Sequence, residues 1–103
     1  MADENAAQNQ ELMLELIAML AQNGWIFMGK RVNPATNKQE AHLEVAKHFI
    51  DMLGALEDRT RGRLSTPEKS FLENELVNLR LTYIAETKNQ PPPEPGKEAA
   101  ADA

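Results

Sequence analysis

Cysteine is absent from this chain of 103 residues. Without a thiol, the protein can form neither a disulfide nor a thiolate metal site, and it has no cysteine nucleophile. The absence is compatible with a reducing cytoplasm, where we expect the protein to be found. A chain of this length makes at most one domain, and the hydrophobic core of so small a domain is marginal unless the protein associates.

Basic residues are absent from residues 1–29, which contain the acids Asp3, Glu4, Glu11 and Glu15. A secretory signal needs a basic start, so this segment is not expected to be one. A membrane-spanning helix needs about 18 or more nearly uninterrupted apolar residues, and Glu15 and Gln22 interrupt the apolar run here. A helix on a membrane surface is a weaker alternative, because such helices usually carry basic polar faces.

Positive charge is scarce in the chain as a whole, since 11 basic residues face 16 acidic ones and the net charge is −5. This balance disfavours nucleic acid as a partner. The sequence also lacks a serine–histidine–aspartate set, a glycine-rich phosphate loop and paired carboxylates in an evident pocket. Small helical enzymes such as chorismate mutases bind anions through inward arginines and lysines, which the first predicted helix lacks. We expect no enzyme activity, no cofactor and no metal.

The most apolar segment is the run LMLELIAML at residues 12–20. At about 100° per residue, its apolar side chains pass almost completely round a helix and leave a narrow polar strip. One neighbouring helix covers far less than that circumference, so the run predicts a partner. The helix is expected at residues 10–28, continuing after Gly24; an extended hydrophobic lid is the alternative for residues 25–28.

Two further helices are predicted after a turn-rich connection at residues 29–38. The segment 39–60 is apolar on about half of its circumference and charged on the other half. A third helix is expected at residues 66–86. Because the turn between these two helices is short, they should pair as an antiparallel hairpin. The predicted fold is all-α, with this hairpin and a long hydrophobic N-terminal helix.

Local signals mark the ends of these helices. Gly62 is placed to adopt the left-handed conformation that ends the second helix. The third helix begins in one of two ways: Thr66 is the N-cap with Pro67 at the first helical position, or Ser65 is the N-cap and Glu68 closes a capping box. Either start fits the sequence.

The two ends of the chain are predicted to be disordered tails. Residues 1–9 are small and polar, and residues 87–103 contain three consecutive prolines and nothing apolar that could anchor the backbone. A ligand for a proline-binding groove is the less favoured interpretation of residues 91–95.

The third predicted helix carries two apolar stripes. One runs through Leu72, Leu76 and Leu79, and the other runs through Val77, Leu81 and Ile84. Two stripes suggest two contacts, so the second stripe should join the first helix in an interface with a partner. The predicted interface consists of Leu12, Leu16, Ile17, Leu20, Val77, Leu81 and Ile84.

Basic residues gather in the middle of the chain, where residues 30–66 hold seven of them against five acids. Such a patch could bind a phosphate or an acidic partner. The favourable position of arginines at the negative end of a helix dipole is the simpler explanation. The candidate patch consists of Lys30, Arg31, Arg59, Arg61 and Arg63.

Arg80 lies between the two stripes of the third helix and should be partly covered. A covered guanidinium needs a carboxylate, so we predict a structural ion pair with Asp51 across the hairpin; Glu73 is the alternative.

A face of the second helix carries possible metal ligands at spacings of four, four and three residues, namely Glu40, Glu44, His48 and Asp51. Glutamate with histidine one turn away can bind a divalent metal. An ordinary solvated face with pairs such as Lys47 and Asp51 is the favoured interpretation.

The order of motifs between residues 29 and 84 is specific. It contains a turn with Asn33, Pro34 and Thr36, a helix with Ala46, Ile50, Asp51 and Leu53, the segment RTRGRL at residues 59–64, and a helix with Leu79, Arg80 and Tyr83. This order resembles the bacterial family called domain of unknown function 1844. Its members share an NP-x-T turn, an A-x-x-x-ID-x-L helix, a KT-[KR]-G-N-L-T turn and an LR-x-x-Y helix. The resemblance implies a small, soluble, helical protein and implies no activity.

This chain departs from the family pattern at three positions. Arg59 replaces the usual lysine, Arg63 replaces the usual asparagine, and His42 stands where a capping asparagine or aspartate is commoner. The turn is therefore more basic than in other members.

The sequence as a whole predicts a non-catalytic interaction or scaffolding module that forms a homo-oligomer, with a homodimer as the first expectation. Another protein is a second possible partner. The alternative function is an anion- or nucleic-acid-binding regulator that uses the basic turn, and a small helical enzyme is less favoured still.

Overall fold

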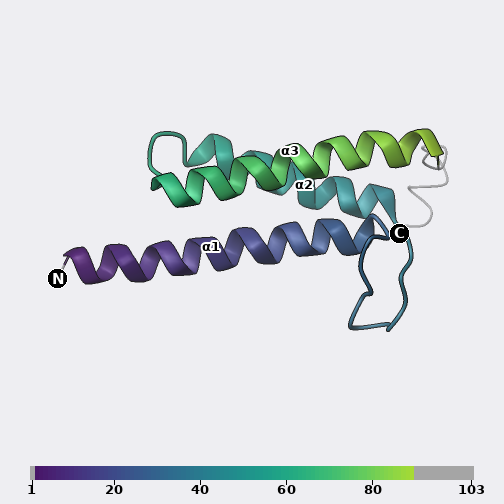
Figure 1. The fold of residues 1–103 in the computed structure, drawn as a ribbon, viewed down its shortest axis with the longest axis horizontal. Coiled ribbons are helices and arrows are strands. Elements are labelled where there is room, and N and C mark those ends of the chain that lie inside the picture. Colours follow the sequence, from purple (N-terminus) through teal and green to yellow (C-terminus); the bar gives the residue numbers. More distant parts are fainter. Residues whose placement is uncertain (1, 90–103) are drawn as a thin grey trace.

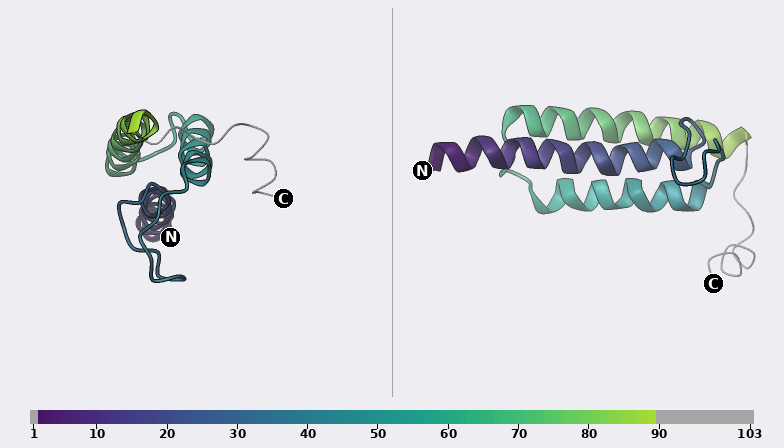
Figure 2. Two further views of the ribbon diagram at one scale, coloured as in Figure 1. Left: turned by 90° about the vertical axis from the view of Figure 1, so that its right-hand side faces the viewer. Right: turned by 90° about the horizontal axis from the view of Figure 1, so that it is seen from below.

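Three helices make up the computed structural model, which describes residues 2–89 and the side chains of residues 5–89. They are α1 (Ala2–Phe27), α2 (Leu43–Arg59) and α3 (Thr66–Asn89), so the all-α prediction is confirmed. Figure 1 shows α2 and α3 side by side and running in opposite directions, with α1 lying along both and parallel to α3. Viewed end-on in Figure 2, the helices sit at the corners of a triangle.

The core lies between the three helices, and each helix contributes to it. Fully buried side chains come from α1 (Ile17), α2 (Leu53) and α3 (Leu72, Leu76 and Leu79). Burying a side chain of this size stabilises the fold by about 1.5–3 kcal/mol. At one end of the core, Phe27 of α1 stacks on Phe49 of α2 with ring centroids 5.8 Å apart.

Helix α1 begins at Ala2 rather than at residue 10, so the predicted tail at residues 2–9 is helical in the structure. Five of the eight residues in this segment are alanine, glutamate or glutamine, which are strong helix formers even without an apolar face to bury. The helix also continues through Gly24, which excludes the lid. A Cβ on Gly24 would lie 3.1 Å from Leu79, so this glycine lets α1 and α3 approach closely.

Helix α2 begins at Leu43 instead of residue 39, because the preceding residues pair with the end of α1. Met28 pairs with Ala41, and the amide of His42 donates to the carbonyl of Phe27 at 2.6 Å. Residues 29–42, which we call the return loop, therefore form a hairpin-like arm. The amide of His42 is held by the end of α1, and residues 39–42 do not extend α2.

Helix α3 starts with the capping box. The amide of Ser65 donates to Oε1 of Glu68 at 2.7 Å, and the amide of Glu68 donates to Oγ of Ser65 at 3.3 Å, so Ser65 is the N-cap. Gly62 has the expected left-handed conformation, with φ of +78°. The helix continues to Asn89, beyond the predicted end at residue 86. The rest of the predicted tail, residues 90–103, lies outside the described residues.

Candidate interaction site

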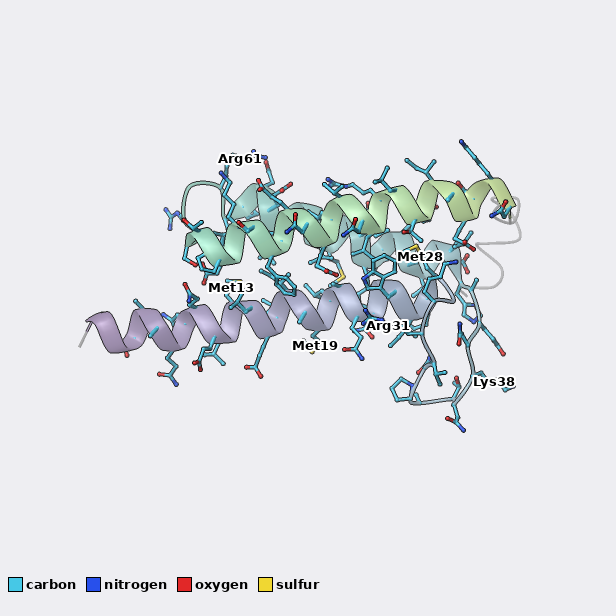
Figure 3. All side chains as sticks on the ribbon, viewed as in Figure 1. Met13, Met19, Met28, Arg31, Lys38 and Arg61 are labelled. Carbon is cyan, nitrogen blue, oxygen red and sulfur yellow. The ribbon has the colours of Figure 1, made fainter. Side chains whose placement is uncertain are left out.

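Helix α1 carries a row of exposed apolar side chains on the side turned away from the core. Leu12 is 54 % exposed, Leu16 is 37 % exposed and Met19 is 56 % exposed. Figure 3 shows Met19 projecting from α1 on the side opposite α3. We call this row, Leu12, Leu16 and Met19, the α1 face. Such a row on a monomeric surface is typical of an interaction site.

Two of the predicted interface residues on α1 belong to the protein's own core. Ile17 is 0 % exposed and Leu20 is half-buried against the core, so the prediction was wrong for Ile17. Ile17 lies one residue from Leu16, and this step of about 100° carries it from the exposed side to the covered side of the helix. Met19 was missed, although it lies within the apolar run.

An open apolar groove borders the α1 face. It has a volume of about 800 Å³ and lies between α1 and the return loop. Its apolar lining comprises Leu12, Leu16, Ala18, Met19, Ile26, Phe27, Pro34 and Ala35. Glu15 is among the polar residues on its border. Because the α1 face forms one wall of this groove, the two features make a single continuous site.

Asn33 fixes the tip of the return loop, which forms the other wall. Its side-chain Oδ1 accepts a hydrogen bond from the amide of Ala35 at 2.9 Å, and its carbonyl accepts one from the amide of Asn37 at 2.6 Å. Asn37 is left-handed with φ of 61°, a conformation that asparagine tolerates. At the base of the loop, Nε2 of Gln39 donates to the carbonyl of Gly29 at 2.9 Å. The wall is therefore held by its own turn chemistry.

The second predicted stripe, on α3, is also exposed but belongs to a different face. Nε1 of Trp25 on α1 donates to Oε1 of Glu75 at 3.1 Å, so Glu75 marks the side of α3 that faces α1. Ile84 follows Glu75 by nine residues, which is about 180° round the helix. Val77, Leu81 and Ile84 thus point away from α1. They do not form one surface with the α1 face.

The predicted basic patch is divided between two regions of the molecule. Lys30 and Arg31 lie in the return loop, where Nζ of Lys30 pairs with Glu86 of α3 at 2.8 Å. Arg59, Arg61 and Arg63 lie at or beyond the other end of α2, whose 17 residues span about 25 Å. Figure 3 shows this separation between the labelled Arg31 and Arg61. A single patch of all five residues is therefore wrong.

The predicted ion pair between Arg80 and Asp51 is not among the ion pairs of residues 5–89. Asp51 instead accepts from Nζ of Lys47 one turn earlier in α2, at 2.8 Å. This hydrogen bond raises the pKa of the Lys47 ammonium above its ordinary value. Arg80 is exposed, and its Nη2 lies 3.0 Å from where a Cβ on Gly54 would be. The absent side chain of Gly54 leaves room for the guanidinium.

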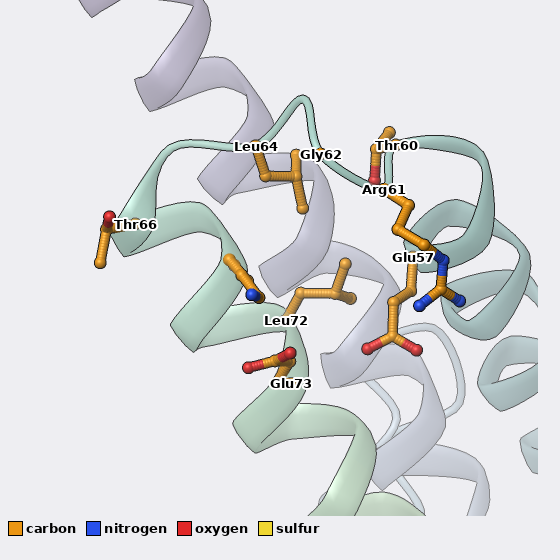
Figure 4. A pocket seen from close by; sticks show the side chains of 9 residues that line it. Glu57, Thr60, Arg61, Gly62, Leu64, Thr66, Leu72 and Glu73 are labelled. Carbon is orange, nitrogen blue, oxygen red and sulfur yellow. The ribbon is translucent and has the colours of Figure 1, made fainter.

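A smaller polar pocket lies at the turn between α2 and α3, with a volume of about 400 Å³. Figure 4 shows carboxylates of Glu57 and Glu73 near its rim and Leu64 and Leu72 inside it. Arg61, which also lines it, pairs with Asp58 at 3.2 Å. The cations and anions at this pocket neutralise one another, which gives it no preference for a ligand of one charge.

Within residues 5–89, no three histidine or carboxylate side chains gather closely enough to hold a metal ion. Glu40, one of the candidate ligands, lies in the return loop and not on α2. Among the described residues, none of the helices combines the length and hydropathy that crossing a bilayer requires.

The family model described as "Domain of unknown function (DUF1844)" matches residues 10–85, which include most of α1, the return loop, α2 and most of α3. The chain matches no curated protein and no solved structure.

Proposed function

This chain belongs to the family described as Domain of unknown function (DUF1844), and on that premise we propose that it is a non-catalytic self-association module. A homodimer forms when the α1 faces of two copies cover each other. The observation that carries this proposal is the exposure of Leu12, Leu16 and Met19 beside an open apolar groove. A second α1 face is the partner with the matching chemistry.

Burial of apolar surface supplies the driving force for this association. Removing apolar surface from water contributes about 25 cal/mol per Å², and each dimer buries two α1 faces and two grooves. The core of the protomer is small, so covering this surface also raises the stability of the fold. Scaffolding follows, because a dimer holds two copies of every other surface at a fixed separation.

Size-exclusion chromatography coupled to light scattering tests the proposal on the full chain. The wild type is expected to have twice the protomer mass of 11.5 kDa, and Leu16→Glu is expected to raise the dimer Kd by at least about tenfold. The matched control is Leu81→Glu, which places the same charge on the exposed face of α3 and should leave the dimer intact. Ile17 is unsuitable for this test, because its substitution would disrupt the core.

Two results would contradict the proposal. The first is a wild type that stays at the protomer mass throughout a concentration series. The second is a dimer that Leu81→Glu dissociates while Leu16→Glu leaves it unchanged. Circular dichroism of each variant establishes that a loss of mass is not a loss of helix.

A further inference from the structure

We infer that the two copies pair antiparallel, so that the return loop of each copy receives the N-terminal half of α1 from the other. This arrangement rests on the proposed function. It adds the relative orientation of the two copies and names the residues that fill each groove. Each groove is then built from one copy's α1 and return loop and is filled by the partner copy. Three observations favour this orientation over a parallel one.

The first observation is the spacing of the groove residues about Met19. Leu12 precedes Met19 by seven residues and Ile26 follows it by seven, so each lies about 10 Å away along the helix axis. An antiparallel crossing at Met19 therefore brings Leu12 of one copy to the end of the groove that Ile26 lines in the other, although Ile26 itself is only 5 % exposed. Pro34 and Ala35 line the groove at that end and provide further apolar contact for the incoming leucine.

The second observation is the position of the return loop. Figure 1 shows that it projects from the end of α1 on the side away from α2 and α3, which is the side where the second copy must lie. In a parallel dimer, the two loops would meet at the same end and compete for the same space. In an antiparallel dimer they lie at opposite ends, and each encloses the N-terminal half of the other α1.

The third observation is the distribution of charge along the α1 face and the return loop. Residues 1–29 carry four acids and no base, whereas the return loop carries Lys30, Arg31 and Lys38. Lys30 pairs with Glu86 at 2.8 Å and Lys38 lies 3.9 Å from Glu40, so Arg31 is the base that this orientation uses. Antiparallel pairing with Leu12 beside Ile26 puts Glu11 opposite Phe27 of the partner subunit, at the end of α1 that leads into Arg31. Parallel pairing would place acids beside acids and bases beside bases. Charge pairs of this kind set the orientation and register of an interface more than its total affinity.

Crosslinking of engineered cysteines tests the orientation, and the cysteine-free chain makes it unambiguous. The exposed residues Glu11 and Arg31 are replaced singly, as Glu11→Cys and Arg31→Cys, and treated with a short bis-maleimide. The antiparallel dimer is expected to give a crosslinked product when the two variants are mixed and little when each is alone. Leu81→Cys on the far face of α3 is the control and should give no product.

The crosslinking outcomes separate this inference from the proposed function. Efficient crosslinking of Glu11→Cys with itself indicates a parallel dimer; it overturns the inference and leaves self-association standing. Crosslinks absent from every variant, together with a wild type at the protomer mass, overturn both. A dimer by mass that lacks the mixed crosslink overturns the antiparallel register alone.

Reversal of charge gives an independent readout. Glu11→Lys or Arg31→Glu alone should raise the dimer Kd by about threefold to tenfold at low salt, because each dimer contains the contact twice. The double variant, Glu11→Lys with Arg31→Glu, should restore the Kd to near the wild-type value. Additive weakening in the double variant would show that these residues do not meet, and it would overturn the register.

Discussion

At the scale of single residues, two glycines share a backbone conformation but have different surroundings. Gly29 has φ of +79° and Gly62 has φ of +78°, a region in which a side chain costs about 1–2 kcal/mol. A Cβ on Gly29 would lie 3.2 Å from the backbone nitrogen of Ala41, whereas a Cβ on Gly62 would meet nothing within 4 Å. A substitution at Gly62 therefore introduces backbone strain alone, whereas a substitution at Gly29 introduces backbone strain and a steric clash.

We predict that Gly62→Ala lowers the free energy of unfolding by about 1 kcal/mol and that Gly29→Ala lowers it by about 2 kcal/mol or more. The extra loss at Gly29 arises because Ala41 is held by its pairing with Met28 and cannot move away freely. Urea denaturation followed by circular dichroism, at one protein concentration, measures both values. Equal losses in the two variants would show that the base of the return loop yields to the added methyl group.

Residue chemistry in the sequence predicted the start of α3 but left its N-cap open. Ser65 and Thr66 are both good N-caps, and Pro67 and Glu68 support one start each. The deciding fact is whether the Glu68 side chain turns back to the Ser65 amide, which it does at 2.7 Å. That choice depends on the conformation of the whole turn and not on residue type.

At the scale of the element, α3 presents the same residue type to two environments. Leu79 is 0 % exposed and packs in the core, and Leu81, two residues later, is 62 % exposed. The helical repeat predicted both stripes from the sequence. It could not predict which stripe would be covered, because that depends on where α1 and α2 lie.

The leucine pair on α3 supplies a matched prediction. Leu79→Ala is expected to lower the free energy of unfolding by about 2–5 kcal/mol, because it leaves a cavity between the helices. Leu81→Ala removes the same atoms from the surface and is expected to change stability by no more than about 0.5 kcal/mol. Thermal unfolding of the two variants side by side makes the comparison. A large loss at Leu81 would mean that the outer face of α3 is covered in solution.

The first residues of α1 and α2 also show that local sequence patterns do not fully determine where a helix begins. Helix α2 was predicted from residue 39, and its actual start at Leu43 follows from the pairing of Met28 with Ala41. Helix α1 was predicted from residue 10, since residues 2–9 offer nothing to bury, yet helix propensity alone extends it. The predicted start of α2 was wrong because of pairing between residues distant in the sequence. The predicted start of α1 was wrong because helix propensity extends the helix toward its N-terminus.

At the scale of the whole molecule, the protomer is elongated, with principal extents of 51 × 28 × 25 Å. Met19 lies about 25 Å along α1 from its start at Ala2, which is near the middle of the long axis. A crossing there adds thickness and little length. The overall shape expected of the proposed dimer thus follows from the position of the α1 face on the protomer.

Small-angle X-ray scattering should detect this shape. We predict that the radius of gyration of the cross-section increases on dimerisation while the longest dimension stays well below twice 51 Å. The matched reference is the Leu16→Glu variant at low concentration, which supplies the protomer profile. A dimer of about 100 Å in length would indicate association end to end, and the α1 face would then lie outside the contact.

Distance within the fold explains why the five predicted basic residues do not form a single site. The five basic residues are separated by α2, so a charge count over residues 30–66 joined groups that the fold holds apart. The helical repeat places Leu12 and Leu16 on one side of α1, because sequence spacing and spatial spacing coincide within a helix. The groove was not predictable from the sequence. Its second wall is the return loop, and the position of that loop beside α1 depends on the fold.

The exposed stripe of α3 gives the protomer a second apolar surface. The α1 face and the stripe of Val77, Leu81 and Ile84 point in different directions, so engaging one leaves the other accessible. If both paired with copies of themselves, growth would not close at two subunits and would continue as a linear filament. A molecular mass that does not rise above that of a dimer over a concentration series would therefore show that the α3 stripes of two copies do not bind each other. In that case the proposed dimer keeps two equivalent α3 stripes exposed to solvent.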